Sequence, residues 1–203
     1  MEESLDPRIN RLPGTGEWKQ EYEKHSLDQF PTFEVFVQAK EDKPFQHEGI
    51  VHAPDSNFAF LFAKEQYSRR YSCSGMWVVN TQNVFVSDYT ENSQNIYDTL
   101  DLDPEKGPLM PYEVFHLMRR GKQHKHVGRV EASGKNHALM EAKAKFDSDK
   151  PVMNTWVVKS SDIFQTQNEH KTIWDTLPLK QFREATDYRG GEKIREFKAK
   201  QKE

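Results

Sequence analysis

The chain has 203 residues, with 29 Lys or Arg against 32 Asp or Glu, so its formal net charge is −3. This balance excludes a general nucleic-acid binder, because no net positive charge is available to displace phosphate counterions. Hydrophobic residues make up only 35%, but aromatic residues reach 12%, so the chain can build one large core or two small ones.

The sequence shows no sign of export or membrane insertion. No apolar run approaches the roughly 18 residues that cross a bilayer. The amino end (MEESLD) is too acidic and polar for a secretory signal peptide. Cys73 is the only cysteine, which excludes an intrachain disulfide and a thiolate zinc cage. We therefore expect a cytoplasmic protein with no membrane contact.

The chain repeats itself, which predicts two copies of one domain. Sliding the sequence by 79 positions aligns three blocks without a gap. These blocks are 34–36 with 113–115, four positions of 47–53 with 126–132, and 77–79 with 156–158. A later block, 96–100 (IYDTL), returns as 173–177 (IWDTL) at an offset of 77, so one loop is shorter in the second copy.

Each copy begins with two predicted strands. Segments 33–38 and 112–117 are rich in β-branched and aromatic residues, which is typical of strands. Segments 47–53 and 126–132 predict the second strand. The repeated residues in this strand are spaced by two, so we expect all four to lie on one face of the sheet.

A helix and a third strand follow in each copy. We expect the helix to run from 55–56 to about residue 70 in copy one, and from 133–134 to about residue 146 in copy two. A third strand is predicted from Trp77 to Phe85 and again from Trp156 to Phe164. The predicted class is therefore α+β, as two tandem β-β-α-β units packed as a pseudo-dimer.

The pseudo-dimer follows from the exposed sheet edge that each three-stranded unit would have alone. Outside the two units, the linker is acidic and the last stretch is basic and is expected to form a solvated helix or tail. The expected divisions are an amino-terminal arm (1–30), repeat 1 (31–100), a linker (101–110), repeat 2 (111–188) and a charged tail (189–203).

The second copy resembles the phenylacetic acid degradation protein B family. The resemblance rests on the segments YEVF at 112–115, HKHVG at 124–128, AL at 138–139 and WVV at 156–158. It covers about 112–177 well and 33–100 more weakly. Two departures are visible: family members are usually a single copy, and the family's Tyr-Arg-His-Pro segment near the carboxyl end is missing.

The resemblance implies a function without catalysis. The family provides the small B subunit of the ring-1,2-phenylacetyl-CoA epoxidase, a multicomponent di-iron monooxygenase. In that enzyme the di-iron site belongs to the A subunit, and electrons come from a flavin and iron–sulfur reductase. The resemblance therefore implies a bridging or regulatory subunit with no cofactor, whose partners are the catalytic di-iron subunit and the structural subunit.

Three histidines are the candidate metal ligands. His124 and His126 share a face of a predicted strand, and His116 lies on the adjoining strand, so they could gather a zinc ion. The alternative is that they form hydrogen bonds within a hairpin. Glu113 and His116 have the Glu-x-x-His spacing of di-iron helices, but on a strand they point to opposite faces.

The other chemical residues are interpreted as structural. Glu34 and His47 recur as Glu113 and His126, which predicts a cross-strand hydrogen-bonded pair in each copy. Cys73 has no neighbouring base in the sequence and is interpreted as a small apolar residue. No glycine-rich phosphate loop occurs, so we predict neither catalytic nor cofactor-binding residues.

The first helix carries the candidate partner-binding residues. Phe58, Leu61 and Phe62 form a second apolar stripe beside the core stripe of this helix. In copy two, His137 and Glu141 replace the two phenylalanines. Exposed aromatic residues in a row indicate an interaction surface. Alternatively, copy two or the amino-terminal arm, with Trp18 and Phe30, covers the stripe within the chain.

Two further functions stay open from the sequence. One is a small-molecule-binding protein that holds an acyl-CoA or an aromatic acid between the copies. The other is a self-contained enzyme that uses the His116, His124 and His126 cluster.

Overall fold

The computed structural model describes residues 29–68, 72–90, 94–147, 150–175 and 190–201. In these residues eight antiparallel strands form one sheet, in the order β4-β7-β5-β6-β2-β1-β3-β8. The predicted α+β class and its tandem units are confirmed. The strands are β1 (Thr32–Gln38), β2 (Gln46–His52), β3 (Gly75–Asn80), β4 (Val84–Val86), β5 (Met110–Leu117), β6 (Lys125–Ala132), β7 (Asn154–Lys159) and β8 (Ile163–Gln165). The helices are α1 (Ser56–Tyr67), α2 (Lys135–Phe146) and α3 (Gly190–Lys200), with short 3-10 turns η2 (Thr81–Asn83), η3 (Ile96–Asp98), η4 (Ser160–Asp162) and η5 (Asn168–Trp174).

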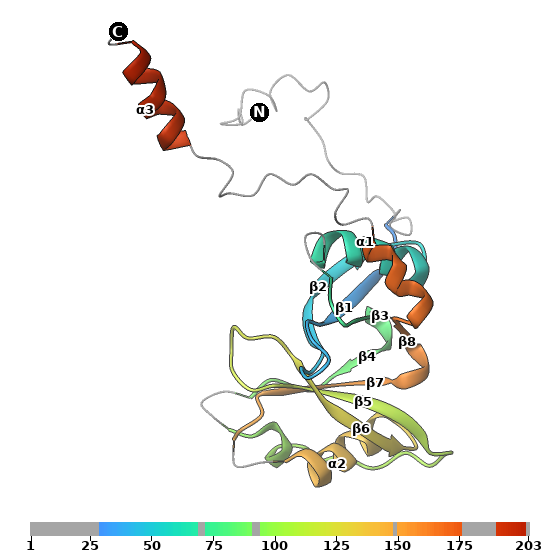
Figure 1. Cartoon of the computed structure of the whole chain (residues 1–203). Coiled ribbons are helices and arrows are strands. Elements are labelled where there is room, and N and C mark those ends of the chain that lie inside the picture. Colours follow the sequence, from blue (N-terminus) through green and yellow to red (C-terminus); the bar gives the residue numbers. More distant parts are fainter. Residues whose placement is uncertain (1–28, 69–71, 91–93, 148–149, 176–189, 202–203) are drawn as a thin grey trace, which may run out of the picture.

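Helices α1 and α2 each cover one half of the sheet (Figure 1). Half 1 consists of β1, β2, α1 and β3, and half 2 consists of β5, β6, α2 and β7. Ala59, Phe60 and Ala63 of α1 and Ala138 and Leu139 of α2 are buried against the strands of their own halves. Helix α1 ends at Tyr67, three residues earlier than predicted. Figure 1 shows α1 and α2 at opposite ends of the part of the molecule that contains the sheet.

The two helices begin differently. Asp55 caps α1, because its carboxylate accepts the backbone N–H of Asn57 and Phe58 at 2.8 and 3.0 Å. Gly134 precedes α2 and has no side chain to do this. Glu105 of the linker takes that place, and its carboxylate accepts the backbone N–H of Asn136 and His137 at 3.1 Å. Burial would raise the pKa of Glu105, but these hydrogen bonds outweigh it and lower the pKa.

A bulge divides the second strand of each half. His47 pairs with Phe36 and Gly49 pairs with Val35, so Glu48 has no partner in β1. The same step occurs at Val127 in β6. The prediction that all four repeated residues share one face is therefore wrong. The extra residue turns His47 and His126 away from the helix, whereas Val51 and Val130 stay in the helix-covered cores.

The predicted third strand is also wrong in one respect, because a 3-10 turn interrupts it. After η2 the chain crosses to the other half, where β4 pairs with β7. After η4 the chain crosses back, and β8 pairs with β3. We call the two crossing segments tail 1 (84–90 and 94–102) and tail 2 (163–175). Each half of the sheet thus receives its edge strand from the other repeat.

A shared core lies between the halves. Phe36 and Phe115 are fully buried, and their rings stack with centroids 4.3 Å apart. The central strands also pair edge to edge, where the amide of His47 donates to the carbonyl of His124 and the amide of His126 donates to that of Phe45, both at 2.9 Å. The predicted pseudo-dimer therefore uses both face packing and edge pairing.

The predicted solvated helix in the charged tail is confirmed, because α3 has no buried residue. Trp18, which was considered as an internal cover for α1, lies outside the described residues. Among the helices that the structure describes, none has the length and apolar character needed to cross a membrane.

The bulge glycine Gly128 gives a first prediction. Its φ is +147°, and a Cβ at this position would lie 2.6 Å from Cζ of Phe146. We expect Gly128→Ala to lower the free energy of unfolding by about 3 kcal/mol, through both backbone strain and this clash. Denaturant unfolding of the purified variant measures the loss.

Gly121→Ala is the matched control. Gly121 also has a positive φ, +77°, but no atom lies within 4 Å of the position that its Cβ would take. Its loss should be about 1 kcal/mol, from backbone strain alone. Equal losses in the two variants would contradict the steric role of Phe146.

Candidate functional site

The outer face of α1 is apolar. Phe58, Leu61 and Phe62 are 49%, 46% and 41% exposed, and the two phenylalanine rings lie 6.0 Å apart. They occupy the side of the helix opposite the buried residues Ala59 and Ala63. We call these three residues the α1 face. Among the described residues the stripe is not covered by the other repeat, which was the alternative considered from the sequence.

The corresponding face of α2 is polar. His137 and Glu141 stand where α1 has Phe58 and Phe62, and His137 Nε2 lies 3.4 Å from a carboxylate oxygen of Glu141. Met140, which corresponds to Leu61, is 41% exposed. Two helices with equivalent places in the fold therefore present different surfaces, and only the α1 face has the row of aromatic side chains that is typical of an interaction surface.

Buried glutamates lie between the halves, and both predicted Glu–His pairs are confirmed. His47 Nε2 donates to Glu34 at 2.6 Å, and His126 Nε2 donates to Glu113 at 2.8 Å. The bulges described above aim both histidines at this interior face. The pairs are therefore a consequence of the strand geometry in each repeat.

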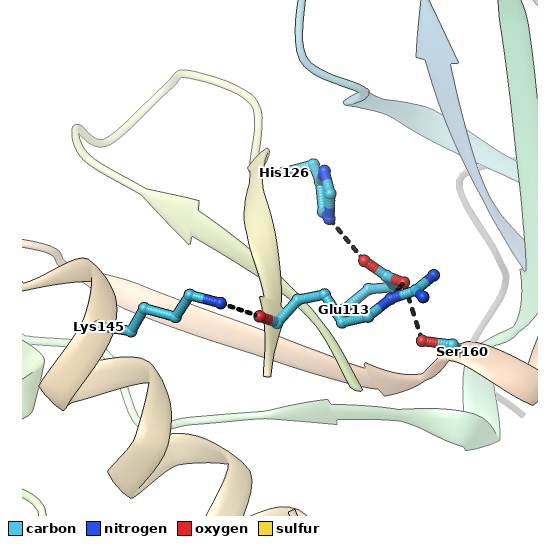
Figure 2. A network of polar contacts seen from close by, with 5 residues as sticks. Glu113, His126, Lys145 and Ser160 are labelled. Atoms are coloured by element: carbon cyan, nitrogen blue, oxygen red, sulfur yellow. Dashed lines mark hydrogen bonds and ion pairs between the residues drawn. The ribbon is translucent and has the colours of Figure 1, made fainter. Parts of the chain in front are cut away.

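Each glutamate also accepts a hydroxyl that the sequence analysis missed. Thr81 donates to Glu34 at 3.0 Å, and Ser160 donates to Glu113 at 2.8 Å. These two hydroxyl residues are 79 positions apart, so the repeat offset could have revealed them. In half 2, Arg129 adds a third donor to Glu113 at 2.7 Å, and Figure 2 shows this network.

The Glu113 network is suited to structure rather than to acid–base catalysis. Burial would raise the pKa of Glu113, but hydrogen bonds from His126, Ser160 and Arg129 outweigh it and lower the pKa. An ionised carboxylate whose two oxygens hold three donors has no proton to give and little basicity left. Lys145 extends the network by donating to the backbone carbonyl of Arg129 at 2.8 Å (Figure 2).

The three candidate metal histidines are separated. His116 points into the core of half 2, where its Nε2 and the Tyr97 hydroxyl are hydrogen-bonded at 2.6 Å. His124 donates to Asn154 Oδ1 at 2.7 Å, and His126 is held by Glu113. In the part of the chain that the structure describes, no three His, Cys, Asp or Glu side chains are grouped to hold a metal ion.

Cys73 packs half-buried against the core of half 1, in agreement with its structural interpretation. Burial raises the pKa of its thiol to about 11, so the nucleophilic thiolate is scarce at neutral pH. The space between the repeats, where a ligand was considered, is occupied by the stacked Phe36 and Phe115. A cavity of about 460 Å³ lies elsewhere, between α2 and Leu100–Leu102 of tail 1.

Comparison with known proteins places this arrangement in a family. The family model described as "Phenylacetic acid degradation B" matches residues 29–102 and again 109–195. The chain is also 27% identical over 95 residues to the B subunit of the 1,2-phenylacetyl-CoA epoxidase of Escherichia coli (strain K12). That alignment covers 47% of this chain and 94% of the relative, which is about one repeat. No solved structure matches the chain.

The two glutamates should differ in their contribution to stability. We expect Glu113→Gln to lower the free energy of unfolding by about 2–3 kcal/mol, because the neutral amide loses charge-assisted bonds from three donors in a buried place. Glu34→Gln is the matched control with two donors, and its loss should be smaller, about 1–2 kcal/mol. Denaturant unfolding at neutral pH measures both, and a larger loss for Glu34→Gln would contradict this account.

The buried histidines should make the fold sensitive to mild acid. Burial lowers the pKa of His124 and of His116 to about 4 each, from 6.5. Below pH 6.5 the unfolded chain therefore binds protons that the folded chain does not, and stability falls as the pH drops towards 4. Each histidine removes up to about 3 kcal/mol over this window.

His124→Phe tests this prediction, because Phe45 occupies the equivalent position in half 1. The free energy of unfolding of this variant should fall less steeply between pH 6.5 and pH 4, by up to about 1.4 kcal/mol per pH unit. Denaturant unfolding at a series of pH values measures the slope. A slope equal to that of the wild type would show that His124 is not the group responsible.

Proposed function

The chain belongs to the phenylacetic acid degradation B family, and from this premise we propose that it is a non-catalytic bridging subunit of an oxygenase complex. The complex would be of the phenylacetyl-CoA epoxidase type and would serve phenylacetate catabolism in the cytoplasm. Its partners would be the catalytic di-iron subunit and the structural subunit. The observation that carries the proposal is the α1 face, which belongs to a fold whose buried glutamates and histidines are hydrogen-bonded within the fold.

The buried glutamates and histidines support a non-catalytic role. Glu34 and Glu113 are saturated by donors, and His116 and His124 are buried and neutral. A general acid or base needs a free position near the proton that it moves. The hydrogen bonds of these side chains instead hold each half together, and the stacked Phe36 and Phe115 join the two halves into a rigid body suited to holding partners in place.

The α1 face supports docking. Two phenylalanines and a leucine, each more than 40% exposed, supply the aromatic and aliphatic anchors that dominate binding energy in subunit interfaces. The rigid sheet behind α1 fixes their positions, so little ordering cost accompanies binding. Because α2 lies at the other end of the molecule with a polar face, the chain offers two unlike ends to its partners (Figure 1).

Phe62→Glu tests the docking role. This change copies Glu141, the residue at the equivalent position of α2, so it is compatible with the helix. We expect it to weaken binding to the partner subunit that docks on the α1 face by about 30-fold or more, because it places a charge in an apolar contact. Co-expression with both subunits, followed by size-exclusion chromatography and titration calorimetry, measures the effect.

Met140→Glu on α2 is the matched control, since Met140 and Phe62 are both 41% exposed. It should leave binding at the α1 face unchanged. Equal weakening by the two variants, or none by Phe62→Glu, would remove the α1 face from the proposal. Separate elution of the wild-type chain from both subunits would contradict the bridging function itself.

A further inference from the structure

The exchanged tails have an alternative place in the same fold. Tail 2 puts Ile163, Phe164 and Gln165 opposite Val79, Val78 and Trp77, and tail 1 puts Val84, Phe85 and Val86 opposite Val158, Val157 and Trp156. The repeat offset makes these two sets of pairs equivalent. Tail 1 could therefore lie on β3 in the same register, closed by a hairpin loop of the four residues 80–83, a common loop length.

Backbone pairing alone does not distinguish the two arrangements. In the exchanged form β4 lies on β7 and β8 lies on β3, whereas in the hairpin form each tail would return to its own half. The strand hydrogen bonds are equivalent in both forms. Two side-chain hydroxyls also occupy corresponding places. Ser87 of tail 1 is hydrogen-bonded to the backbone of Thr155, and Thr166 of tail 2 is hydrogen-bonded to the backbone of Met76. The preference for the exchanged form over the hairpin form must therefore come from side chains that differ between the repeats.

The large buried residue of each tail is such a difference. Tail 1 inserts Tyr97, which is fully buried and whose hydroxyl is bonded to His116 at 2.6 Å. Tail 2 inserts Trp174, which is 6% exposed and whose Nε1 donates to Ser68 Oγ at 2.8 Å. Tyr97 and Trp174 are equivalent residues of the IYDTL and IWDTL blocks, so the two halves hold the same anchor position with different partners.

The partners would be mismatched in the hairpin form. Val37 stands in half 1 where His116 stands in half 2, and Asp147 stands in half 2 where Ser68 stands in half 1. Tyr97 on half 1 would bring its buried hydroxyl against Val37. His116, which is 3% exposed, would lose that hydroxyl and face an indole instead. Buried polar groups without partners are costly, and such costs are an established way to specify one pairing over another.

We propose that the Tyr97–His116 and Trp174–Ser68 pairs are specificity determinants that direct each tail to the opposite half. These four side chains then determine the exchange. Transposing the two anchor residues, Tyr97 and Trp174, should therefore reverse it. This inference is independent of the proposed docking function.

Disulfide trapping reads out which arrangement is present. In a Cys73→Ser background, Phe85→Cys is combined either with Val157→Cys, its partner in the exchanged form, or with Val78→Cys, its partner in the hairpin form. Opposed residues of antiparallel strands have Cα atoms about 4.5–5.5 Å apart, which suits a disulfide. The full-length chain is refolded under reducing conditions and then oxidised. Peptide mass spectrometry of the monomer fraction identifies the cross-link.

With the natural anchors, we expect the 85–157 cross-link and not the 85–78 cross-link. The variant Tyr97→Trp with Trp174→Tyr moves each anchor to the other tail. It should raise the 85–78 fraction about tenfold or more, because each tail now matches its own half. The restoring variant also transposes the pockets, with Val37→His, His116→Val, Ser68→Asp and Asp147→Ser, and should return the chain to the 85–157 cross-link.

The remaining outcomes overturn the proposal. A tail-transposed variant that folds and gives only the 85–157 cross-link would show that the anchors do not select the arrangement. A tail-transposed variant that fails to fold would show that the hairpin form is not accessible, so that nothing remains to be selected. Formation of the 85–78 cross-link with the natural anchors would contradict the exchange itself.

Discussion

The reciprocal exchange of edge strands is the constraint on which the rest of the structure depends. Neither half completes its core with its own sequence. The core of half 1 includes Phe164 and Ile173 from tail 2, and the core of half 2 includes Ile96 and Tyr97 from tail 1. The stacked Phe36 and Phe115 then join the two cores. We therefore expect the two halves to unfold together as one cooperative unit, although the sequence contains two copies of one domain.

The repeat offset explains how much of this could be predicted. Residues at equivalent positions of the two copies occupy equivalent places in the fold. The fold class, the helices α1 and α2 and the two Glu–His pairs could therefore be predicted from the sequence. The bulges were not predicted, because Gly49 and Gly128 fit the two-residue spacing of the repeated strand positions. A glycine within a strand is nevertheless a known signal of a bulge. The exchange of edge strands could not be predicted, because a loop of four residues can either close a hairpin or lead the chain to the other half of the sheet. The cap from Glu105 depends on a contact across about 30 residues, which no local pattern encodes.

In the proposed function, the differences between the copies carry the functional information. The interior keeps the same plan in both halves, with a glutamate, a histidine and a hydroxyl in matching places. The outer helices diverge, and the sequence located the α1 face through this divergence. A fused pair can change one face without changing the other, whereas two identical chains cannot. In the proposed function, this freedom gives a bridge with two unlike ends.

The most direct test of the bridging account is hydrogen–deuterium exchange of the full chain, alone and mixed with the catalytic and structural subunits. The account predicts that partner binding slows exchange of the α1 amides, residues 56–67, while the interior strands β1 and β5 stay as protected as in the free chain. Unchanged exchange of α1 in a mixture that forms a complex would contradict the account, because the subunits would then be held by some other surface.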